Sequence, residues 1–309
     1  MKTLAPADLK VIKNWMYRNA RPLDLARWKF HFEAGGVEAV LEALAAYQNE
    51  DGGFGHALEA DAWNPHSSPI QTATAVERLL EVHFQDNSHP AVQGILKYLD
   101  SGAEMDGNTW MNVVASFNDY PHAPWWHTTS SSTARSIFNP TAILAGFILR
   151  FADRDSRLYE RGLGIAKELE ELFLQDPHIE MHPLLCVVKL LECIGEAGVR
   201  EQFAYTELNA AAGKRITELL ERNASDWSGY SCKPSFFIKT RESLGFTDNA
   251  VLLKKELDYT LDIRNQEGVW DLTWSWDGFE QAFAISENWW KASIVIEKLL
   301  FLRAFGRLG

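Results

Sequence analysis

The sequence predicts an all-α protein, a single domain of about six helical hairpins that spans residues 1–309. Apolar residues recur every three or four positions along most of the chain, and no stretch alternates as a strand would. Five apolar segments begin with a proline, which suits the first turn of a helix, and another helical stretch precedes each of them. These pairs recur at a spacing of about 50 residues, which is typical of a repeat architecture.

The helical pattern assigns an outer and an inner helix to each hairpin. The outer helices are expected at about 7–18, 37–48, 91–99, 158–174, 205–222 and 249–264. The more apolar inner helices are expected to begin at Pro22, Pro69, Pro140, Pro183 and Pro234, with a last one at about 288–304. Ser68 and Asn139 are expected as N-caps, and Gln71 completes a capping box with Ser68. An insertion or lid at about 101–139 lengthens one hairpin.

Composition limits the classes of partner. The chain has 309 residues, 46% of them apolar, and a net charge of −12, which argues against nucleic acid or an anionic membrane as the main partner. Three cysteines without a C-x-x-C pair fit a reducing compartment. The first residues contain no apolar run of signal-peptide type, and the longest apolar run, 142–149, is too short to span a bilayer. We therefore expect a cytoplasmic protein without an integral membrane segment, and leave its oligomeric state open.

Six hairpins can stack as an open solenoid or close into a double ring with the inner helices at its centre. Closure would bring the inner helix N-termini, and the loops before them, to one end of the ring. Helix N-termini carry partial positive charge, so that end would favour an anionic group of a ligand.

The segment "YQNEDGGFG" (47–55) lies between an outer and an inner helix, and it resembles the Q-x-x-D-G-G-x-G repeat of the terpenoid cyclase and protein prenyltransferase superfamily, which includes squalene-cyclase-like proteins. "RNQEGVWD" (264–271) is a weaker copy, with Gln266, Gly268 and Trp270 in corresponding roles, and "SDWSGYS" (225–231) is a degenerate third. The resemblance implies an α/α toroid with a central cavity, in which these loops clamp neighbouring helices.

The chain departs from the catalytic motifs of that superfamily. "SPIQTA" (68–73) stands where class II cyclases carry D-x-D-D-T-A, and it lacks all three carboxylates. No D-D-x-x-D motif and no convincing zinc ligand set of the prenyltransferases is present. The resemblance therefore predicts fold more strongly than activity.

Three loops concentrate carboxylates, imidazoles and tryptophans. General acid–base chemistry uses such carboxylates and imidazoles, and tryptophan faces bind cations or stack on sugar rings. The candidate catalytic residues are Glu59, Asp61, Asp119, His122, Asp271 and Asp277. The candidate substrate-binding residues are Trp63, His66, Tyr120, Trp125, Trp126, Trp274, Trp276, Glu287 and Trp289. In a closed ring the three loops are expected to line one pocket, where burial beside tryptophan would raise the pKa of a carboxylate.

Each loop also has a structural interpretation. Glu59 and Asp61 can cap the following helix, the insertion can plug the ring, and the last loop can seal the joint between the last and first hairpins. His182 and Cys186 share one helix face and would supply half a metal site, but a buried thiol and a capping histidine are the more ordinary interpretation. We expect no cofactor and no metal.

Three functions remain open from the sequence. The first is an enzyme that binds a largely apolar, isoprenoid-like small molecule in a tryptophan-rich cavity. The second is a carbohydrate-active (α/α)6 enzyme such as a glycoside hydrolase, epimerase or lyase, with separated carboxylates. The third is a non-catalytic scaffold that has kept the fold and lost the acid motifs.

Overall fold

A computed structural model of the chain describes residues 2–129 and 136–309, so residues 130–135 of the predicted insertion lie outside the described residues. The described residues form twelve α-helices, and the only sheet among them has two short strands, which confirms the all-α class. The helices are α1 (Pro6–Asn19), α2 (Pro22–Phe32), α3 (Val37–Ala45), α4 (Pro69–Glu81), α5 (Pro90–Ser101), α6 (Thr141–Phe151), α7 (Arg157–Gln175), α8 (Met181–Ala197), α9 (Tyr205–Asn223), α10 (Pro234–Phe237), α11 (Ala250–Asp262) and α12 (Glu280–Ala304). They follow the predicted order as six consecutive pairs.

The chain divides into two compact units. Unit 1 comprises Met1–Ala43 and Ile216–Gly309, and unit 2 comprises Leu44–Arg215. Both boundaries fall inside helices, the first in α3 and the second in α9. Whether the units make one domain, as the sequence predicts, stays a prediction.

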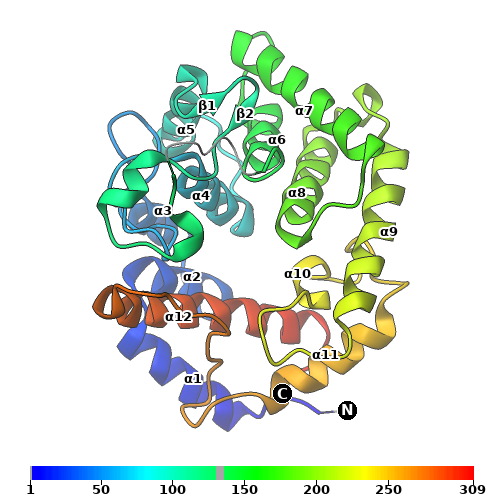
Figure 1. The fold of residues 1–309 in the computed structure, drawn as a ribbon. Coiled ribbons are helices and arrows are strands. Elements are labelled where there is room, and N and C mark those ends of the chain that lie inside the picture. The colour runs from blue at the N-terminus through cyan, green and yellow to red at the C-terminus, as the bar shows by residue number, and fades with distance from the viewer. Residues whose placement is uncertain (1, 130–135) are drawn as a thin grey trace. The chain divides into compact units, whose positions relative to one another are not determined.

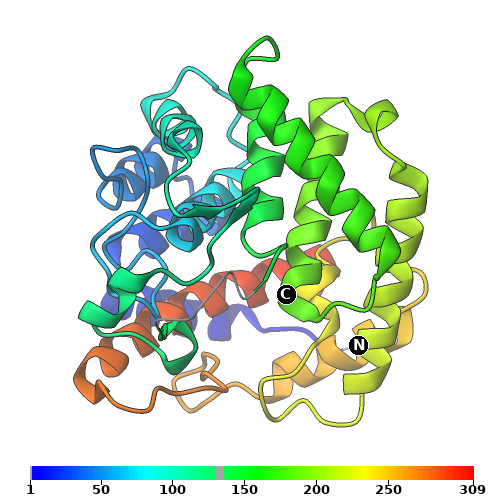
Figure 2. The same ribbon diagram turned by 45° about the horizontal axis from the view of Figure 1, so that its top comes forward.

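Unit 1 joins the two ends of the chain. Leu4 and Leu308 form a parallel bridge, in which the Leu4 N–H donates to the Arg307 carbonyl at 2.8 Å. Helix α12, drawn in orange to red, packs against α1 and α2, drawn in blue (Figure 1; Figure 2). The predicted contact between the first and last hairpins is thereby confirmed.

Unit 2 is built around α6. Ten of the eleven α6 residues are buried, because the segment "TAILAGFILRF" is apolar on every side, and the helix packs on α8, α7, α4 and α5 (Figure 1). Gly146 allows α8 to approach closely, since a Cβ at this position would lie 3.0 Å from the Cβ of Cys193. The insertion between α5 and α6 holds β1 (Met105–Asp106), β2 (Thr109–Trp110), and the 3-10 helices η1 (Ala115–Asp119) and η2 (Pro124–Trp126), while a third 3-10 helix, η3 (Arg200–Gln202), precedes α9.

Of the two predicted N-caps, the structure contains one and not the other. Ser68 caps α4 as predicted, because its Oγ accepts the N–H of Gln71 at 3.4 Å. The predicted cap at Asn139 is wrong: Pro140 occupies the N-cap position of α6 and makes no side-chain cap bond.

Two inner helices differ from their predicted extents. Helix α10 has only four residues, because the Ser243 hydroxyl accepts the N–H groups of Lys239 and Thr240 and folds the chain into turns. Helix α12 begins at Glu280 rather than near residue 288. Its first turns bury only small residues, Ala282 and Ser286, so the periodicity of large apolar side chains begins later than the helix.

Candidate functional site

The first half of the loop between α3 and α4 is a clasp on α5. Gln48 donates through Nε2 to the carbonyls of Gly52 at 3.0 Å and of Ala91, in α5, at 3.1 Å. Gly52 has a φ of +93°, and a Cβ there would lie 2.0 Å from the carbonyl oxygen of Gly94. Phe54 is fully buried beneath the turn. The predicted clamping role of this motif is confirmed.

The weaker copy repeats the same backbone hydrogen bonds in unit 1. The Asn265 N–H donates to Val269 at 2.8 Å and the Gly268 N–H to Asn265 at 3.0 Å, and the corresponding bonds from Asn49 and Gly52 are both 2.9 Å long. The positions equivalent to Gly52 and Phe54 are Gly268 and Trp270, as predicted.

The expected role of Gln266 is wrong. Arg264, four residues before Gly268, stands where Gln48 stands relative to Gly52, and its Nε donates to the Leu261 carbonyl at 3.4 Å. Position 266 corresponds to Glu50 of the first clasp.

Each clasp packs on the first helix of the following hairpin. The first contacts α5, and in the degenerate third the Trp227 carbonyl accepts the hydroxyl of Tyr259 in α11 at 2.8 Å. The last clasp follows the final outer helix and packs on α1, where a Cβ at Gly268 would lie 3.3 Å from Val11 Cγ1. The order of contacts thus returns from the end of the chain to its beginning.

The second half of the first loop has a strained backbone, which a buried side chain supports together with backbone hydrogen bonds. His56 and Ala57 have φ values of +59° and +60°, a region that residues with a Cβ rarely occupy. Gln71 of α4 accepts the Leu58 N–H through Oε1 and donates through Nε2 to the Asn64 carbonyl, both at 3.0 Å. Its side chain therefore fixes the acidic loop and does not complete the predicted capping box.

The two carboxylates of this loop are buried. Glu59 is 8% and Asp61 3% exposed. Glu59 Oε2 accepts the backbone N–H of Asp61 at 2.9 Å, which makes a tight local turn. Neither side chain caps α4, whose N-terminal N–H groups use Ser68.

A short antiparallel contact joins the acidic loop to the insertion. Ala62 faces His122, the Trp63 N–H donates to the Pro121 carbonyl at 2.9 Å, and the Ala123 N–H donates to the Asp61 carbonyl at 2.8 Å. Successive side chains of extended chain point to opposite faces. His122 therefore shares a face with Ala62 and its apolar cluster, and Asp61 and Trp63 project from the other face.

Two imidazoles of the insertion form a hydrogen-bonded pair. His122 Nδ1 lies 2.6 Å from the Tyr120 carbonyl, which can only accept, so this nitrogen carries a proton. His122 Nε2 then accepts from His127 Nδ1 at 3.1 Å when His122 is neutral, and the rings stack at 5.3 Å. Neutral His127 is left with Nε2 as its basic nitrogen. Because His122 is buried and His127 exposed, the pair connects the interior of the loop assembly to its surface.

The other predicted residues of the acidic loop and the insertion have separate contacts. His66 Nε2 lies 3.2 Å from the Tyr120 hydroxyl, so the two predicted binding residues are in contact. Trp126 packs edge-on against Phe117 at 5.9 Å, whereas Trp125 is 40% exposed. Asp119 is exposed at the end of η1.

The last loop, in unit 1, forms an ion-pair chain. Lys291 Nζ lies 3.0 Å from Asp271 Oδ1 and 2.9 Å from Glu287 Oε1, which brings two predicted residues together. Burial alone would raise the pKa of Asp271, but hydrogen bonds from Lys291 and Asn265 hold this pKa below its usual range. The expected rise of the carboxylate pKa is therefore not found at Asp271, which suits an electrostatic role better than that of a proton donor.

The predicted tryptophans of unit 1 pack in different surroundings. Trp274 meets Trp290 edge-on at 5.5 Å, and Trp276 is buried 5.6 Å from Phe283. Trp289 lies beneath the guanidinium of Arg21 at 5.5 Å. Asp277 is exposed beside the turn at Gly278. The predicted convergence of this loop with the loops of unit 2 stays a prediction.

No group of three or more metal-ligating side chains occurs in the described ranges. Cys186 is buried and its pKa is raised by burial, while burial lowers the pKa of His182. The buried thiol fits the ordinary interpretation of Cys186, whereas His182 is an exposed residue in the first turn of α8, whose N-cap is Glu180. None of the helices that the structure describes combines the length and apolar character needed to cross a bilayer.

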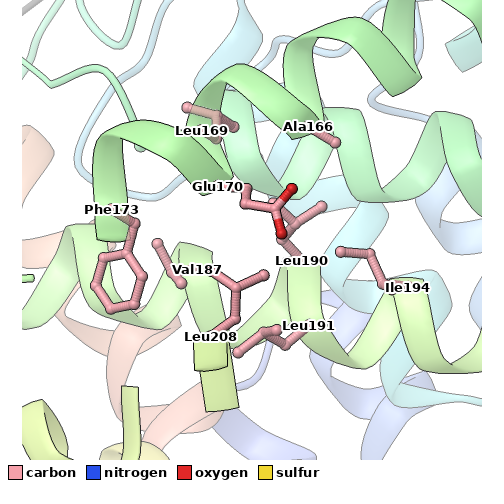
Figure 3. A pocket seen from close by; sticks show the side chains of 9 residues that line it. All are labelled: Ala166, Leu169, Glu170, Phe173, Val187, Leu190, Leu191, Ile194 and Leu208. Carbon is pink, nitrogen blue, oxygen red and sulfur yellow. The ribbon is translucent and has the colours of Figure 1, made fainter. Parts of the chain in front are cut away.

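An apolar pocket lies elsewhere in unit 2, between α7 and α8, with Leu208 of α9 at its edge (Figure 3). Glu170 is its one charged lining residue, and that carboxylate accepts the backbone N–H of Ala204. None of the predicted site residues lines this pocket.

Sequence reasoning missed three residues of these assemblies: Gln71 as the support of the acidic loop, His127 as the partner of His122, and Lys291 as the bridge between Asp271 and Glu287. Only His127 carried a usable signal, because it lies in the same short insertion as His122. Comparison of the chain with protein-family models, curated proteins and solved structures finds no match.

Proposed function

We propose that this chain is an enzyme with an α/α toroid fold of the terpenoid cyclase and protein prenyltransferase type, and that it acts on a small, largely apolar ligand. General acid–base groups of the acidic loop and the insertion in unit 2 would catalyse the reaction. Two kinds of observation support the proposal, one concerning architecture and one concerning chemistry.

The architectural support is the order of the clasps. The first and last clasps share backbone hydrogen bonds, each of the three loops packs on the next outer helix, and the last packs on α1. A closed ring of six hairpins requires such a return to the first helix, and an open solenoid does not.

The observation that carries the chemistry is the His122–His127 pair. A donor–acceptor chain runs from the Tyr120 carbonyl through both rings and leaves His127 Nε2 as the basic nitrogen. An exposed imidazole held in one tautomer by a buried one can act as a general acid or base. The tryptophans beside it, Trp125 and Trp126, supply apolar surface for a ligand.

A carbohydrate-active enzyme is the second candidate. Trp125 is 40% exposed on the same insertion as Tyr120, whose hydroxyl contacts His66 of the acidic loop. An exposed aromatic face with polar neighbours suits a sugar ring, which has one apolar face and a rim of hydroxyl groups.

Binding of defined probes separates the candidates. Titration calorimetry would use farnesol and geranylgeraniol as apolar probes, and a panel of oligosaccharides as polar ones. We expect the isoprenoid alcohols to bind, Trp125→Ala to weaken that binding, and Tyr17→Ala, an equally exposed aromatic on α1, to leave it unchanged. Oligosaccharide binding that needs Trp125 would favour the second candidate, and no binding of either class would favour the scaffold.

The acid–base role of His122 and His127 is tested by measuring turnover. Once a probe is converted, His127→Gln should lower kcat about 100-fold or more, because the amide cannot take up a proton. His89→Gln, at the N-cap of α5, is the control. An unchanged kcat in the His127 variant would contradict the proposed acid–base role.

A further inference from the structure

A hydroxyl, a carboxylate and an ammonium group meet in unit 1, far in sequence from the acidic loop. Ser235 of α10 donates its hydroxyl to Glu256 Oε1 in α11, and its backbone N–H donates to Glu256 Oε2 at 2.6 Å. The ammonium of Lys298, in α12, lies 3.3 Å from Ser235 Oγ and 3.4 Å from Glu256 Oε1. Three helices thus bring together groups that lie up to 63 residues apart in the chain.

The two hydrogen bonds of the Ser235 hydroxyl orient its oxygen for nucleophilic attack. The hydroxyl directs its proton at a carboxylate that can take it up, and the Ser235 N–H holds that carboxylate in place. The hydroxyl oxygen has two lone pairs, and the bond from Lys298 occupies only one of them. A nucleophile bonded to a base that a further group orients is the arrangement that nucleophilic catalysis requires.

Stability alone does not account for this arrangement. Glu256 is fully buried, and Ser235 is 8% exposed. Burying a carboxylate costs free energy that one ion pair often fails to return, and apolar residues in place of such a pair are often neutral or stabilising. Side chains of the same three types serve as nucleophile and proton-transfer groups in class A β-lactamases.

Lys298 connects this buried centre to the solvent. Its side chain is 20% exposed. An ammonium has three N–H donors, and Ser235 and Glu256 are the only acceptors of Lys298 within the described ranges. The third donor can bond a carbonyl oxygen that becomes negative when the hydroxyl attacks. A small acyl compound would therefore reach Ser235 from the side of Lys298.

We propose that Ser235 is a nucleophile for acyl transfer from an ester, with Glu256 as general base and Lys298 as hydrogen-bond donor to the oxyanion. The bond from Ser235 Oγ to the acyl carbon forms as the bond from that carbon to the leaving oxygen breaks. The proton passes from Ser235 through Glu256 to the leaving oxygen, which departs as an alcohol. Water then hydrolyses the acyl ester, which releases the acid and restores the Ser235 hydroxyl. The neighbouring rings of Phe236 and Tyr230, 6.5 Å apart, favour an apolar acyl group.

Covalent labelling of the full native chain tests this site. An alkyl fluorophosphonate reports a nucleophilic serine, because the bond from Oγ to phosphorus forms as fluoride leaves. We expect an adduct at Ser235, located by peptide mass spectrometry. Ser88 is the internal control: it is exposed and its hydroxyl donates to Asp86 Oδ1 at 2.6 Å, but no ammonium bonds that hydroxyl in the part of the chain that the structure describes. Equal labelling of the two serines, or labelling of Ser235 only after denaturation, would overturn the proposal.

Variants separate proton transfer from a structural role. Glu256→Gln keeps the size of the side chain but cannot take up the proton, so it should slow labelling of Ser235 about 100-fold. Glu242→Gln, at an exposed glutamate, is the matched control. His127→Gln should label as the wild type does, which separates this site from the acid–base role proposed in unit 2. If Glu256→Gln does not fold, the comparison of Ser235 with Ser88 in the wild type still decides; an unchanged labelling rate in folded Glu256→Gln would contradict the proposal.

Discussion

At the scale of single residues, the Gln71 amide supports the loop of Glu59 and Asp61. Gln71→Leu keeps the volume but removes the Gln71 bonds to the Leu58 N–H and the Asn64 carbonyl, which keep their backbone bonds to Gly55 and His56. A typical hydrogen bond contributes about 0.5–1.5 kcal/mol, so we expect a loss of about 1–3 kcal/mol in unfolding free energy. Denaturant titration measures it. Gln93→Leu, whose amide bonds an exposed carbonyl, should change stability by less than about 0.5 kcal/mol.

Cys193 offers a test of burial at the same scale. Burial raises the pKa of this thiol from 9.0 to about 12. Because the folded pKa exceeds the unfolded one, Cys193 stabilises the fold below pH 9 relative to higher pH, and this contribution is lost as pH rises toward 12. At pH 8 the buried thiol stays protonated, so iodoacetamide should label the Cys193 peptide only after unfolding. Rapid labelling of the native chain would show that the thiol is accessible.

Single residues were predictable where the chemistry is local. Ser68 caps α4 because a short hydroxyl three residues before an N–H can reach it in any helix start. Asn139 has the same local signal, yet the chain places Pro140 at the N-cap. Gln71 and Lys291 act on partners that only the folded chain brings near, so no spacing in the sequence points to them.

At the scale of elements, the clasp glycines are predicted to differ in sensitivity. Gly52→Ala would place a residue with a Cβ at a positive φ. That Cβ would lie 2.0 Å from the backbone oxygen of Gly94, which cannot move unless α5 moves with it. Gly268→Ala meets only the Val11 side chain at 3.3 Å. We expect Gly52→Ala to destabilise the protein by at least about 1 kcal/mol more than Gly268→Ala. Gly198→Ala, with a φ of +68° and open space around it, measures the backbone strain alone.

The positions of the prolines and the periodicity of apolar residues predicted twelve helices in the order that the structure shows. Both signals arise from interactions within one turn of a helix. The predicted lengths of two helices were wrong, because side chains that do not belong to the apolar pattern determine where these helices begin or end. Ser243 ends α10 after one turn, and small buried residues hide the start of α12. The acidic loop and the insertion were both singled out by composition, but their junction at Ala62 and His122 is a tertiary contact between segments about 60 residues apart, which periodicity does not encode.

At the scale of the whole molecule, the chain passes between its two compact units within continuous helices. The boundaries at 43/44 and 215/216 fall inside α3 and α9, so unfolding one unit would break helical hydrogen bonds at the edge of the other. Helix formation is cooperative, and a broken end must be nucleated again at a cost. We therefore predict one unfolding transition for the chain.

Leu4→Ala tests that cooperativity. Leu4 is fully buried and bridges Leu308 within unit 1, so its truncation should cost about 2–4 kcal/mol. If the units unfold together, the slowest-exchanging amides of α6 and α8 in unit 2 should lose the same protection as those of α2 and α12. Native-state hydrogen exchange measures both sets in one experiment. A loss confined to α2 and α12 would show that the units unfold separately, and a coupled loss would mean that closure of the chain ends in unit 1 stabilises the helices that support the acidic loop.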